Sequence, residues 1–575
     1  MPAHENVSMK ECLYEGSAIK MSNNENGANV RATHAAVTRR SFLTAAAAGA
    51  VATVTTTAGM PLTHAVAAEE AVDEAGNQLV PTWLVKPEPI TDFAQTYEYD
   101  VVVVGAGESG LSAVHGALEG GAKVACLQNT DTAFTTGNMA ASIDLSKTSE
   151  AALQACISFI NWKNDYRSDR DLVETWARNS QEALAWWADA GAQGGVESQP
   201  YDYTLNYNGY DIYLHANTYF HCDGAHNDSS QIICQQEAEA GCDFYFNTPA
   251  VQLQTDGSGA VTGVIGQDAN GNYLLFTASK GVILCTGDYT GNIEMRDYYC
   301  PDLKGFDPGV ALRDGSGYAM GMWAGAVITP PMHTKMCHNE PFPYRLEMPF
   351  LFLNYKGERF MDENCGGRMG YLNNYIREYL AETEFANTFV GKIWSIVPNN
   401  WQDYVEEWQA ANPYEISTHN AYRDVDPSAW IQADTLEDLC AAINAYMEEN
   451  GYGLDPIDTQ TFVDQVNRYN ELCAAGADDD FGKNPMYMVP IDSAPYYAVP
   501  RGNADASSAI LAGLVIDGNG QCLDQYRRPI PGLFAAGNAS GQFFGGVDYP
   551  MNIEGLSIGR AITSGYVTGG YVARL

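Results

Sequence analysis

The stretch of residues 99–128 constrains the fold of this chain more than any other part of the sequence. Its four consecutive valines, residues 101–104, predict a strand buried on both faces, as in the middle of a parallel sheet. The glycines that follow, Gly105, Gly107 and Gly110, have the G-x-G-x-x-G spacing of a dinucleotide-binding turn. The first permits a tight turn, the second lets backbone N–H groups approach a pyrophosphate, and the third packs the next helix onto the strand.

A helix that begins near Ser109 and a strand over residues 123–127 complete a predicted β-α-β unit, which places a phosphate at the positive end of the helix. In such folds an acidic side chain after the second strand holds the ribose hydroxyls, but here that position is Gln128. An amide can still hydrogen-bond a ribose diol, without charge assistance. The order of strand, glycine turn, helix and strand favours dinucleotide binding over a glycine loop without a ligand.

Length and net charge limit the class of protein to which this chain can belong. A chain of 575 residues exceeds one ordinary core, so two domains with extensions are expected. The net charge of −40 repels nucleic acids and anionic membranes, which argues against both as partners. The 13 cysteines include no C-x-x-C, so the sequence contains neither a zinc ribbon nor an ordinary iron–sulfur ligand run, and it leaves disulfides open.

The N-terminal region has the form of an export signal. Thr-Arg-Arg-Ser-Phe-Leu at residues 38–43 precedes a small apolar run over residues 45–54, which is typical of the twin-arginine route. Small residues at 65–67 offer a cleavage site, so we expect residues 1–68 to be a signal region that is removed. A membrane anchor is the alternative, but the run is too short and too interrupted by threonine to span a bilayer.

Histidines occur in two clusters. His221 and His226 lie in a region rich in Tyr, Asn and Gly that we interpret as a loop, with a metal site as the alternative. His333 and His338 fit a structural histidine pair best, then a polar wall of a substrate cleft, and then a metal cluster. We therefore predict no metal site.

The order of the remaining segments predicts an interrupted domain. Residues 150–192 show helical periodicity with tryptophans that we expect in the core, residues 242–267 contain short strands, and residues 281–285 form a second buried strand. The predicted organisation is a lead-in over 69–94, one domain made of 95–329 and 509–575, and an inserted second domain over 330–508.

Four motifs in this order resemble the superfamily of fumarate reductase and succinate dehydrogenase flavoproteins, which includes urocanate-type reductases and 3-ketosteroid 1-dehydrogenases. The motifs are residues 105–110; Leu-Cys-Thr-Gly at 284–287; Arg-Asp-Gly at 313–315 with Trp-Ala-Gly-Ala at 323–326; and residues 532–538 followed by 555–560. The resemblance covers residues 97–575. It implies an α/β fold with a Rossmann-like FAD-binding domain of the glutathione-reductase type, an inserted α+β capping domain, and chemistry at carbon–carbon bonds.

The resemblance and the glycine turn together give the expected FAD contacts. In the family, backbone N–H groups carried here onto Ser557 and Ile558 face the flavin pyrimidine, and Asn538 lies near the ribityl chain. The small-residue loop at 135–142 is expected to pass close to the flat ring. The predicted cofactor residues are Gly105, Gly107, Ser109, Gly110, Gln128, Gly137, Asn138, Thr286, Gly287, Asp288, Gly537, Asn538, Ser557 and Ile558.

The cationic side chains with which fumarate reductases bind their substrate are poorly matched in this sequence. Their arginine acid follows a Gly-x-Arg-Phe-x-x-Glu segment, present here at 357–363, but its expected position holds Gly367, with Arg368 one residue later. Ala509 stands where the family places a histidine, and Tyr549 belongs to an Asp-Tyr-Pro run where the family has a further arginine. Without these cations the fork that grips a dicarboxylate is missing, so fumarate is not the expected substrate.

Tyr549 with the following proline resembles the Tyr-Pro of the ketosteroid dehydrogenases, whose hydroxyl bonds the substrate ketone and polarises it for hydride addition. We expect Tyr549 to be the electrophilic donor and Arg368 the proton donor, with Tyr497 or Arg501 as reserves. For Tyr497 and Tyr549, packing alone is the alternative role.

The hypothesis is an exported FAD-dependent reductase that transfers a hydride from flavin N5 to an activated C=C bond of an enone or α,β-unsaturated acid. Since no haem or iron–sulfur motif is evident, electrons are expected from a separate cytochrome or quinol-linked donor, and the protein is not expected to be integral to the membrane. One alternative is a dehydrogenase of the ketosteroid type that runs in the opposite direction. Another is an exported flavin- or ligand-binding protein without catalysis.

Overall fold

The computed structural model describes residues 62–66, 80–135, 137–219, 228–303, 312–331, 333–337, 349–363, 393–411, 427–451, 453–501, 507–546, 549 and 552–575. All of them belong to one compact unit, residues 61–575. The predicted signal at 38–54 and the histidines His221, His226 and His338 lie outside the described residues.

The main sheet has eight strands and is built on the predicted β-α-β unit. Strand β1 (Gln95–Val104) lies between β2 (Val124–Leu127) and β9 (Tyr273–Leu284), and it is parallel to both. Parallel strands β6 (Asp243–Tyr245) and β17 (Pro529–Ala535) extend the sheet on either side. Three antiparallel strands complete it: β7 (Ala250–Thr255), β8 (Val261–Gln267) and β16 (Gln521–Leu523). The valines 101–104 are all buried, as the sequence predicts.

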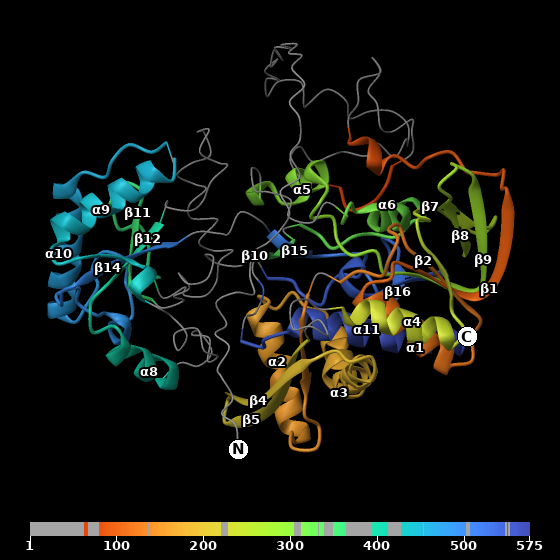
Figure 1. Cartoon of the computed structure of the whole chain (residues 1–575), viewed down its shortest axis with the longest axis horizontal. Coiled ribbons are helices and arrows are strands. Elements are labelled where there is room, and N and C mark those ends of the chain that lie inside the picture. The colour runs from red at the N-terminus through yellow and green to blue at the C-terminus, as the bar shows by residue number, and fades with distance from the viewer. Residues whose placement is uncertain are drawn as a thin grey trace, which may run out of the picture. The chain divides into compact units, whose positions relative to one another are not determined.

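Two helices from opposite ends of the chain pack against each other beside this sheet (Figure 1). They are α1 (Glu108–Glu119), which follows β1, and α11 (Leu556–Ala573), which ends the chain. A Cβ atom added to Gly565 would lie 2.1 Å from the carbonyl oxygen of Ser109, and one added to Gly569 would lie 2.1 Å from that of Ala113. Only glycine allows this approach, because any side chain would overlap the backbone of α1.

A second layer consists of a three-stranded sheet and helices. The sheet order is β3-β5-β4, with bounds β3 (Met139–Ile143), β4 (Ser198–Tyr207) and β5 (Tyr210–Tyr219). The helices are α2 (Glu150–Lys163), α3 (Arg170–Gln193) and α4 (Ser229–Glu239). Trp176 and Trp187 of α3 are core residues, as predicted. The β4–β5 hairpin and β3 are not identified by the sequence analysis, which expected a loop over the β3 segment.

The segment expected as an insert contains a sheet and a core of its own. The sheet order is β11-β12-β14-β13, with bounds β11 (Leu351–Asn354), β12 (Ile393–Val397), β13 (Ile431–Ala433) and β14 (Tyr496–Arg501). The helices are α8 (Gln402–Ala411), α9 (Leu436–Glu449) and α10 (Thr459–Ala475). Leu353, Ile396, Ile443 and Phe462 form one apolar cluster drawn entirely from this segment. This agrees with an α+β insert that folds around its own core.

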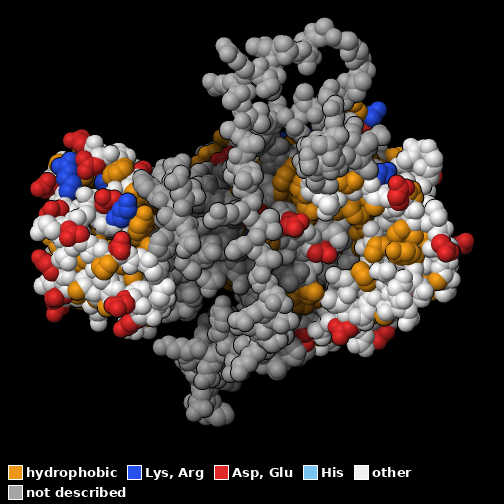
Figure 2. Space-filling view, turned by 90° about the horizontal axis from the view of Figure 1, so that it is seen from above, with side chains coloured by type: hydrophobic (Ala, Val, Ile, Leu, Met, Phe, Trp, Pro, Cys, Tyr) orange, Lys and Arg blue, Asp and Glu red, His pale blue; other side chains and the backbone are white. Residues whose placement is uncertain are grey.

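The remaining described α-helices and strands connect these parts. They are the helices α5 (Ile293–Tyr299) and α6 (Ser316–Trp323) and the strands β10 (Thr334–Cys337) and β15 (Ser507–Leu511). Strands β10 and β15 pair antiparallel, so the two chain crossings of the expected insert lie side by side. Asp and Glu side chains are scattered over the surface, with few Lys or Arg between them, in keeping with the net charge of −40 (Figure 2).

Residues 62–66 are part of the folded unit, although the sequence analysis assigns them to the removed signal region. The N–H of Leu62 donates to the Tyr298 hydroxyl at 2.9 Å, and the Tyr299 hydroxyl donates to the Leu62 carbonyl at 2.7 Å. Val66 is 5% exposed, and its N–H donates to the Leu84 carbonyl at 3.0 Å. These contacts bury apolar and backbone groups that removal of residues 62–66 would expose.

Candidate cofactor and active site

A cavity of about 400 Å³ lies where the parallel strands of the main sheet end. Residues after β1, β2 and β9 line it, together with Asn538 beyond β17 and the first turn of α11. The carboxyl ends of parallel strands are where α/β sheets bind their ligands, because the following turns and helix starts converge there. Of the predicted cofactor residues, the cavity lining includes Gly105, Gly107, Ser109, Gln128, Thr286, Gly287, Asn538, Ser557 and Ile558.

The glycine turn forms one wall of this cavity. Gly105 has φ +104°, and a Cβ atom there would lie 2.4 Å from the carbonyl oxygen of Cys285. A Cβ atom on Gly110 would lie 1.8 Å from the carbonyl oxygen of Gly105. The turn is therefore closed against β9, and α1 begins at Glu108 with its positive end at the cavity.

Gln128 lines the cavity, but its amide is engaged with the protein. Its Oε1 accepts from the N–H of Ala106 at 2.9 Å, and its Nε2 donates to the Thr130 hydroxyl at 2.6 Å. The side chain thus ties the end of β2 to the glycine turn. Its second oxygen lone pair and second N–H remain the groups with which it can contact a ribose.

Several buried polar atoms of the cavity lining have no hydrogen-bond partner among the described residues. They are Oε1 of Glu108, Oγ1 of Thr286 and Oδ1 of Asn538. An unpaired buried polar atom costs free energy, so a polar ligand that supplies the missing partners would stabilise this region. The hydroxyls, phosphates and ring heteroatoms of a dinucleotide can supply these partners. The N-terminal ends of α1 and α11 also suit its negatively charged phosphates.

Glu108 is the feature of the cavity that the sequence analysis does not single out. Burial raises the pKa of its carboxyl to about 7, while the nearby Arg313 guanidinium and the Gly137 N–H favour the ionised form. Arg313 also lines the cavity and forms an ion pair at 3.0 Å with the fully buried Asp288. An acid within the glycine turn was the available signal, but acids are common in the first turn of any helix.

The other five predicted cofactor residues support the cavity without lining it. The Asp288 carboxylate accepts from Arg313 and from the N–H groups of Thr290, at 2.7 Å, and Ile510, at 3.2 Å. The Asn138 carbonyl accepts from the N–H of Tyr219 at 2.8 Å and so continues the pairing of β3 and β5. Close packing favours glycine at the remaining three positions: a Cβ atom on Gly110 would meet the backbone of Gly105, and one on Gly137 or Gly537 would meet the side chain of Ile558 or Ser109.

The comparisons with known proteins agree with this geometry. The model of the FAD binding domain family matches residues 100–549. The chain belongs to this family.

Two flavoprotein relatives and one solved structure illustrate the match. The chain is 27% identical over 506 residues to a vinyl phenol reductase from Lactiplantibacillus plantarum, which covers 83% of this chain and 96% of that protein. It is 27% identical over 542 residues to a urocanate reductase from Eggerthella lenta, with 88% and 80% covered. A 3-ketosteroid Δ1-dehydrogenase from Sterolibacterium denitrificans has the same fold, with TM-score 0.58, 18% identity, and 83% and 99% covered.

These findings confirm the resemblance, the fold class and the cofactor. The protein is a flavin-dependent oxidoreductase that binds FAD in an α/β fold with a Rossmann-like domain. No helix among the described residues has the length and apolarity to cross a membrane. The described residues also contain no cluster of side chains suited to bind a metal ion.

Tyr549 precedes α11 in the chain, and its hydroxyl lies beside the first turn of that helix. Its hydroxyl accepts from the N–H of Ser557 at 3.2 Å and donates to the Ile553 carbonyl at 3.4 Å. Burial raises the pKa of Tyr549, so the phenol is protonated at neutral pH. The Ser557 N–H, which the resemblance directs at the flavin, therefore bonds this hydroxyl here.

Two further tyrosines and an acid surround this region, and the sequence analysis misses them. The Tyr201 hydroxyl donates to Oε2 of Glu554 at 2.6 Å, and the Tyr203 hydroxyl accepts from the Glu554 N–H at 3.1 Å. Burial raises the pKa of both phenols. Both lie on β4, more than 300 residues from Glu554, so no local pattern indicates the contact.

The other predicted catalytic residues are not brought to the cavity by any described contact. Tyr497 on β14 is half-buried, and its hydroxyl lies 3.5 Å from Oδ1 of Asn399. Arg501 ends β14, and its backbone is paired with Ile393. Arg368 lies outside the described residues.

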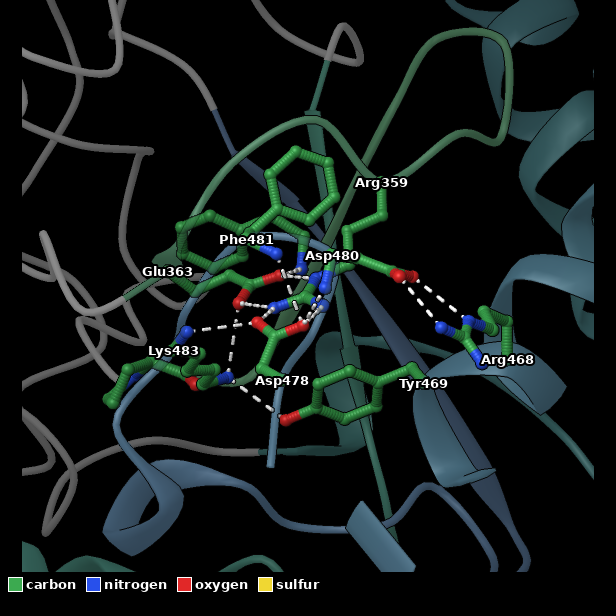
Figure 3. A network of polar contacts seen from close by, with 10 residues as sticks. Arg359, Glu363, Arg468, Tyr469, Asp478, Asp480, Phe481 and Lys483 are labelled. Atoms are coloured by element: carbon green, nitrogen blue, oxygen red, sulfur yellow. Dashed lines mark hydrogen bonds and ion pairs between the residues drawn. The ribbon is translucent and has the colours of Figure 1, made fainter. Parts of the chain in front are cut away.

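The Arg-Phe-x-x-Glu segment that precedes Arg368 forms a buried ion network (Figure 3). Arg359 pairs with Glu363 at 2.8 Å and with Asp478 at 2.7 Å, and Lys483 lies 3.2 Å from Glu363. Burial alone would raise the pKa of Asp478, but hydrogen bonds from Arg359 and from the Lys483 backbone lower it to about 2. Two cations and two anions neutralise each other, so the segment joins β11 to the turn after α10.

His333 has a structural role, in agreement with the preferred interpretation. The residue is 1% exposed, its Nε2 donates to the Thr329 carbonyl at 2.7 Å, and its Nδ1 bonds the Tyr289 hydroxyl. Both ring nitrogens are therefore used within the protein.

Proposed function

We propose that this flavoprotein reduces an activated C=C bond of an enone or α,β-unsaturated acid, with Tyr549 as the electrophilic donor. The observation that carries the proposal is the position of the Tyr549 hydroxyl. It bonds the N–H of Ser557, a residue that lines the cofactor cavity. The reductase names of the vinyl phenol and urocanate relatives support the same class of substrate.

The hydrogen bonds of Tyr549 suit it to polarise a carbonyl group. Accepting from Ser557 at the positive end of α11 increases the donor strength of the phenol O–H. The bond that the hydroxyl donates to the Ile553 carbonyl is long, at 3.4 Å, and in this proposal a substrate oxygen takes its place. A donor placed at a developing enolate oxygen stabilises the transition state more than the ground state.

FAD, when bound, supplies the hydride equivalent. Glu108, Thr286 and Asn538 would hold its polar groups through their unpaired oxygens, and the first turn of α11 would favour negative charge beside Ser557. Arg368, Tyr497 and Arg501 remain the proposed sources of the proton. A separate cytochrome or quinol-linked donor would deliver the electrons.

The raised pKa of Tyr549 suits it to the donor role in either direction and makes it a poor base for a ketosteroid-type dehydrogenation. A base must be deprotonated to accept a proton, whereas a protonated phenol is a hydrogen-bond donor at neutral pH. The dehydrogenase alternative therefore needs another base, for which Tyr497 or another phenol is proposed.

An anaerobic assay with a reduced dye as donor tests the proposal. We expect oxidation of the dye with cyclic enones or aryl acrylates and little with fumarate. The Tyr549→Phe variant should lose about 100-fold or more in kcat while it retains FAD, because removal of one transition-state donor costs that much. Tyr526→Phe is the matched control, since Tyr526 is 68% exposed. Turnover of Tyr549→Phe at the wild-type rate, or no dye oxidation with any unsaturated acceptor, would refute the assignment.

We also propose export by the twin-arginine route, with cleavage before Leu62. The supporting observations are the Arg39-Arg40 pair ahead of an apolar run and the packing of residues 62–66 into the folded unit. Cell fractionation of an Arg39→Lys, Arg40→Lys variant tests the route, and mass spectrometry of the mature N-terminus tests the cut. A mature chain that begins at residue 69 would contradict the second point.

A further inference from the structure

The lining of the cofactor cavity includes an apolar part that neither the glycine turn nor α11 supplies. It consists of Pro249, Ala250 and Val251, at the start of β7, and of Met320 and Trp323 from α6. Helix α6 and strand β7 lie side by side, so these residues form one wall (Figure 1). None of the five side chains ionises. A flat, largely apolar ring suits this wall better than a phosphate does.

Trp323 ends α6 and has its only polar group engaged by the protein. The residue is half-buried, and its indole N–H donates to the carbonyl oxygen of Trp83 at 3.0 Å. An indole has one donor and no acceptor. With this donor in use, the ring can offer a ligand only its apolar and aromatic surface, which favours stacking against another aromatic ring.

Trp83 lies near the N-terminal end of the folded unit and is held there by aromatic contacts. The centroid of its ring lies 5.7 Å from that of Tyr298 and 5.5 Å from that of Tyr299. The hydroxyls of these two tyrosines also bond the backbone of Leu62, one to its N–H and one to its carbonyl. The carbonyl that orients the Trp323 ring is therefore fixed by a segment that does not line the cofactor cavity.

We propose that Trp323 stacks on the adenine of FAD and that Trp83 positions its ring. FAD carries two aromatic systems at opposite ends of its pyrophosphate. With the pyrophosphate at the start of α1 and the flavin beside Ser557, the adenine takes the apolar wall between β7 and α6. Trp323 is a cofactor-binding residue in this proposal, and Trp83 is a positioning residue. Neither takes part in hydride transfer, so the proposal holds for any substrate of the enzyme.

Titration of the full chain after removal of FAD, with FAD, ADP and FMN as separate probes, tests the stacking. ADP contains the adenine, whereas FMN contains the flavin and one phosphate without the adenine. Trp323→Leu should raise the dissociation constants of FAD and ADP by about tenfold, as expected for loss of one base–aromatic stack, and leave that of FMN unchanged. Trp323→Phe, which keeps an aromatic ring but loses the N–H, should weaken ADP binding much less. Calorimetry measures all three constants.

A double-mutant cycle tests the positioning role of Trp83. Trp83→Leu removes the ring that packs against Tyr298 and Tyr299 but keeps the backbone carbonyl. It should weaken ADP binding in the wild type and have no further effect in Trp323→Leu, because that variant has no indole to orient. An equal loss of ADP affinity in both backgrounds would contradict the positioning role.

Trp162→Leu is the matched control, since Trp162 is a half-buried tryptophan on α2 that does not line the cavity. Its variant should bind ADP and FMN like the wild type. Phe134 is the other aromatic ring in the lining, and its N–H bonds the Ala106 carbonyl in the glycine turn at 3.3 Å. Loss of ADP affinity in Phe134→Leu but not in Trp323→Leu would overturn the assignment, and so would an equal loss for ADP and FMN in Trp323→Leu.

Discussion

Replacement of Glu108 by glutamine should change how FAD affinity depends on pH. Glu108 lines the cofactor cavity at the first turn of α1, where we propose that the FAD pyrophosphate binds. A carboxylate there would repel the phosphates, whereas a neutral carboxyl can donate a hydrogen bond to them. Because the pKa of Glu108 is about 7, the apoprotein loses this proton near neutral pH.

The magnitude follows from linkage of one proton to binding. If the complex keeps the carboxyl protonated and the apoprotein titrates near pH 7, the FAD dissociation constant rises by about tenfold between pH 6 and pH 8. This corresponds to about 1.4 kcal/mol. The direction of the pH dependence follows because Glu108 must be protonated for FAD to bind tightly. The affinity for FAD is therefore highest below the pKa of Glu108 and falls as pH rises through it.

Titration of the apoprotein with FAD, followed by quenching of flavin fluorescence, measures the effect. Glu108→Gln should bind FAD with the same affinity at pH 6 and pH 8, and at pH 8 about tenfold more tightly than the wild type. Glu119→Gln is the matched control, since Glu119 ends the same helix with its side chain 54% exposed. A wild-type dissociation constant independent of pH, or an equal slope in Glu108→Gln, would refute the reasoning.

Two changes test the packing that holds the site. Gly569→Ala should lower the free energy of unfolding by about 1–3 kcal/mol in denaturant titrations, because its Cβ would lie 2.1 Å from the Ala113 carbonyl oxygen. Gly570→Ala is the control and should cost nothing, because its Cβ would lie 3.4 Å from a flexible arginine nitrogen and 3.7 Å from the Gly116 carbonyl oxygen. Asp478→Asn should cost about 3–5 kcal/mol at neutral pH, because it leaves the two buried cations Arg359 and Lys483 with Glu363 as the one remaining carboxylate of the network. Since folding lowers the pKa of Asp478 from 3.8 to about 2, its contribution is complete above the ordinary value and is lost as pH falls toward 2; urea titrations should therefore show a flatter acid limb in the variant.

The parts of the fold that the sequence predicts are those specified by local patterns. Valines 101–104 and the glycine turn predict β1 and the start of α1, and the structure confirms both. Buried strands followed by small residues likewise locate β9 and the Thr286 turn. In each case one short segment contains both the element and its boundary, so neighbouring residues suffice.

Contacts between segments that are distant in the sequence cannot be predicted from local patterns. Glu554 meets Tyr201 across more than 300 residues, and Arg359 meets Asp478 across 119. Gln128 was predicted from its position to bind ribose, yet the Ala106 N–H and the Thr130 hydroxyl already use its amide. Such choices between a ligand and the protein depend on geometry that forms only after the chain has folded.

The glycines of α11 explain why the cofactor cavity needs both ends of the chain. Gly565 and Gly569 bring α11 into backbone contact with α1, so the start of α1 at Glu108 and the start of α11 at Leu556 are fixed on one pair of packed helices. Close-packed helices transmit displacement because they contain no space to absorb it. A shift of α11 that moves Ser557 and Tyr549 therefore also moves the wall formed by α1. The proposed phosphate site at Glu108 and the proposed hydride-transfer site at Ser557 thus share one support, although they lie more than 400 residues apart in the sequence.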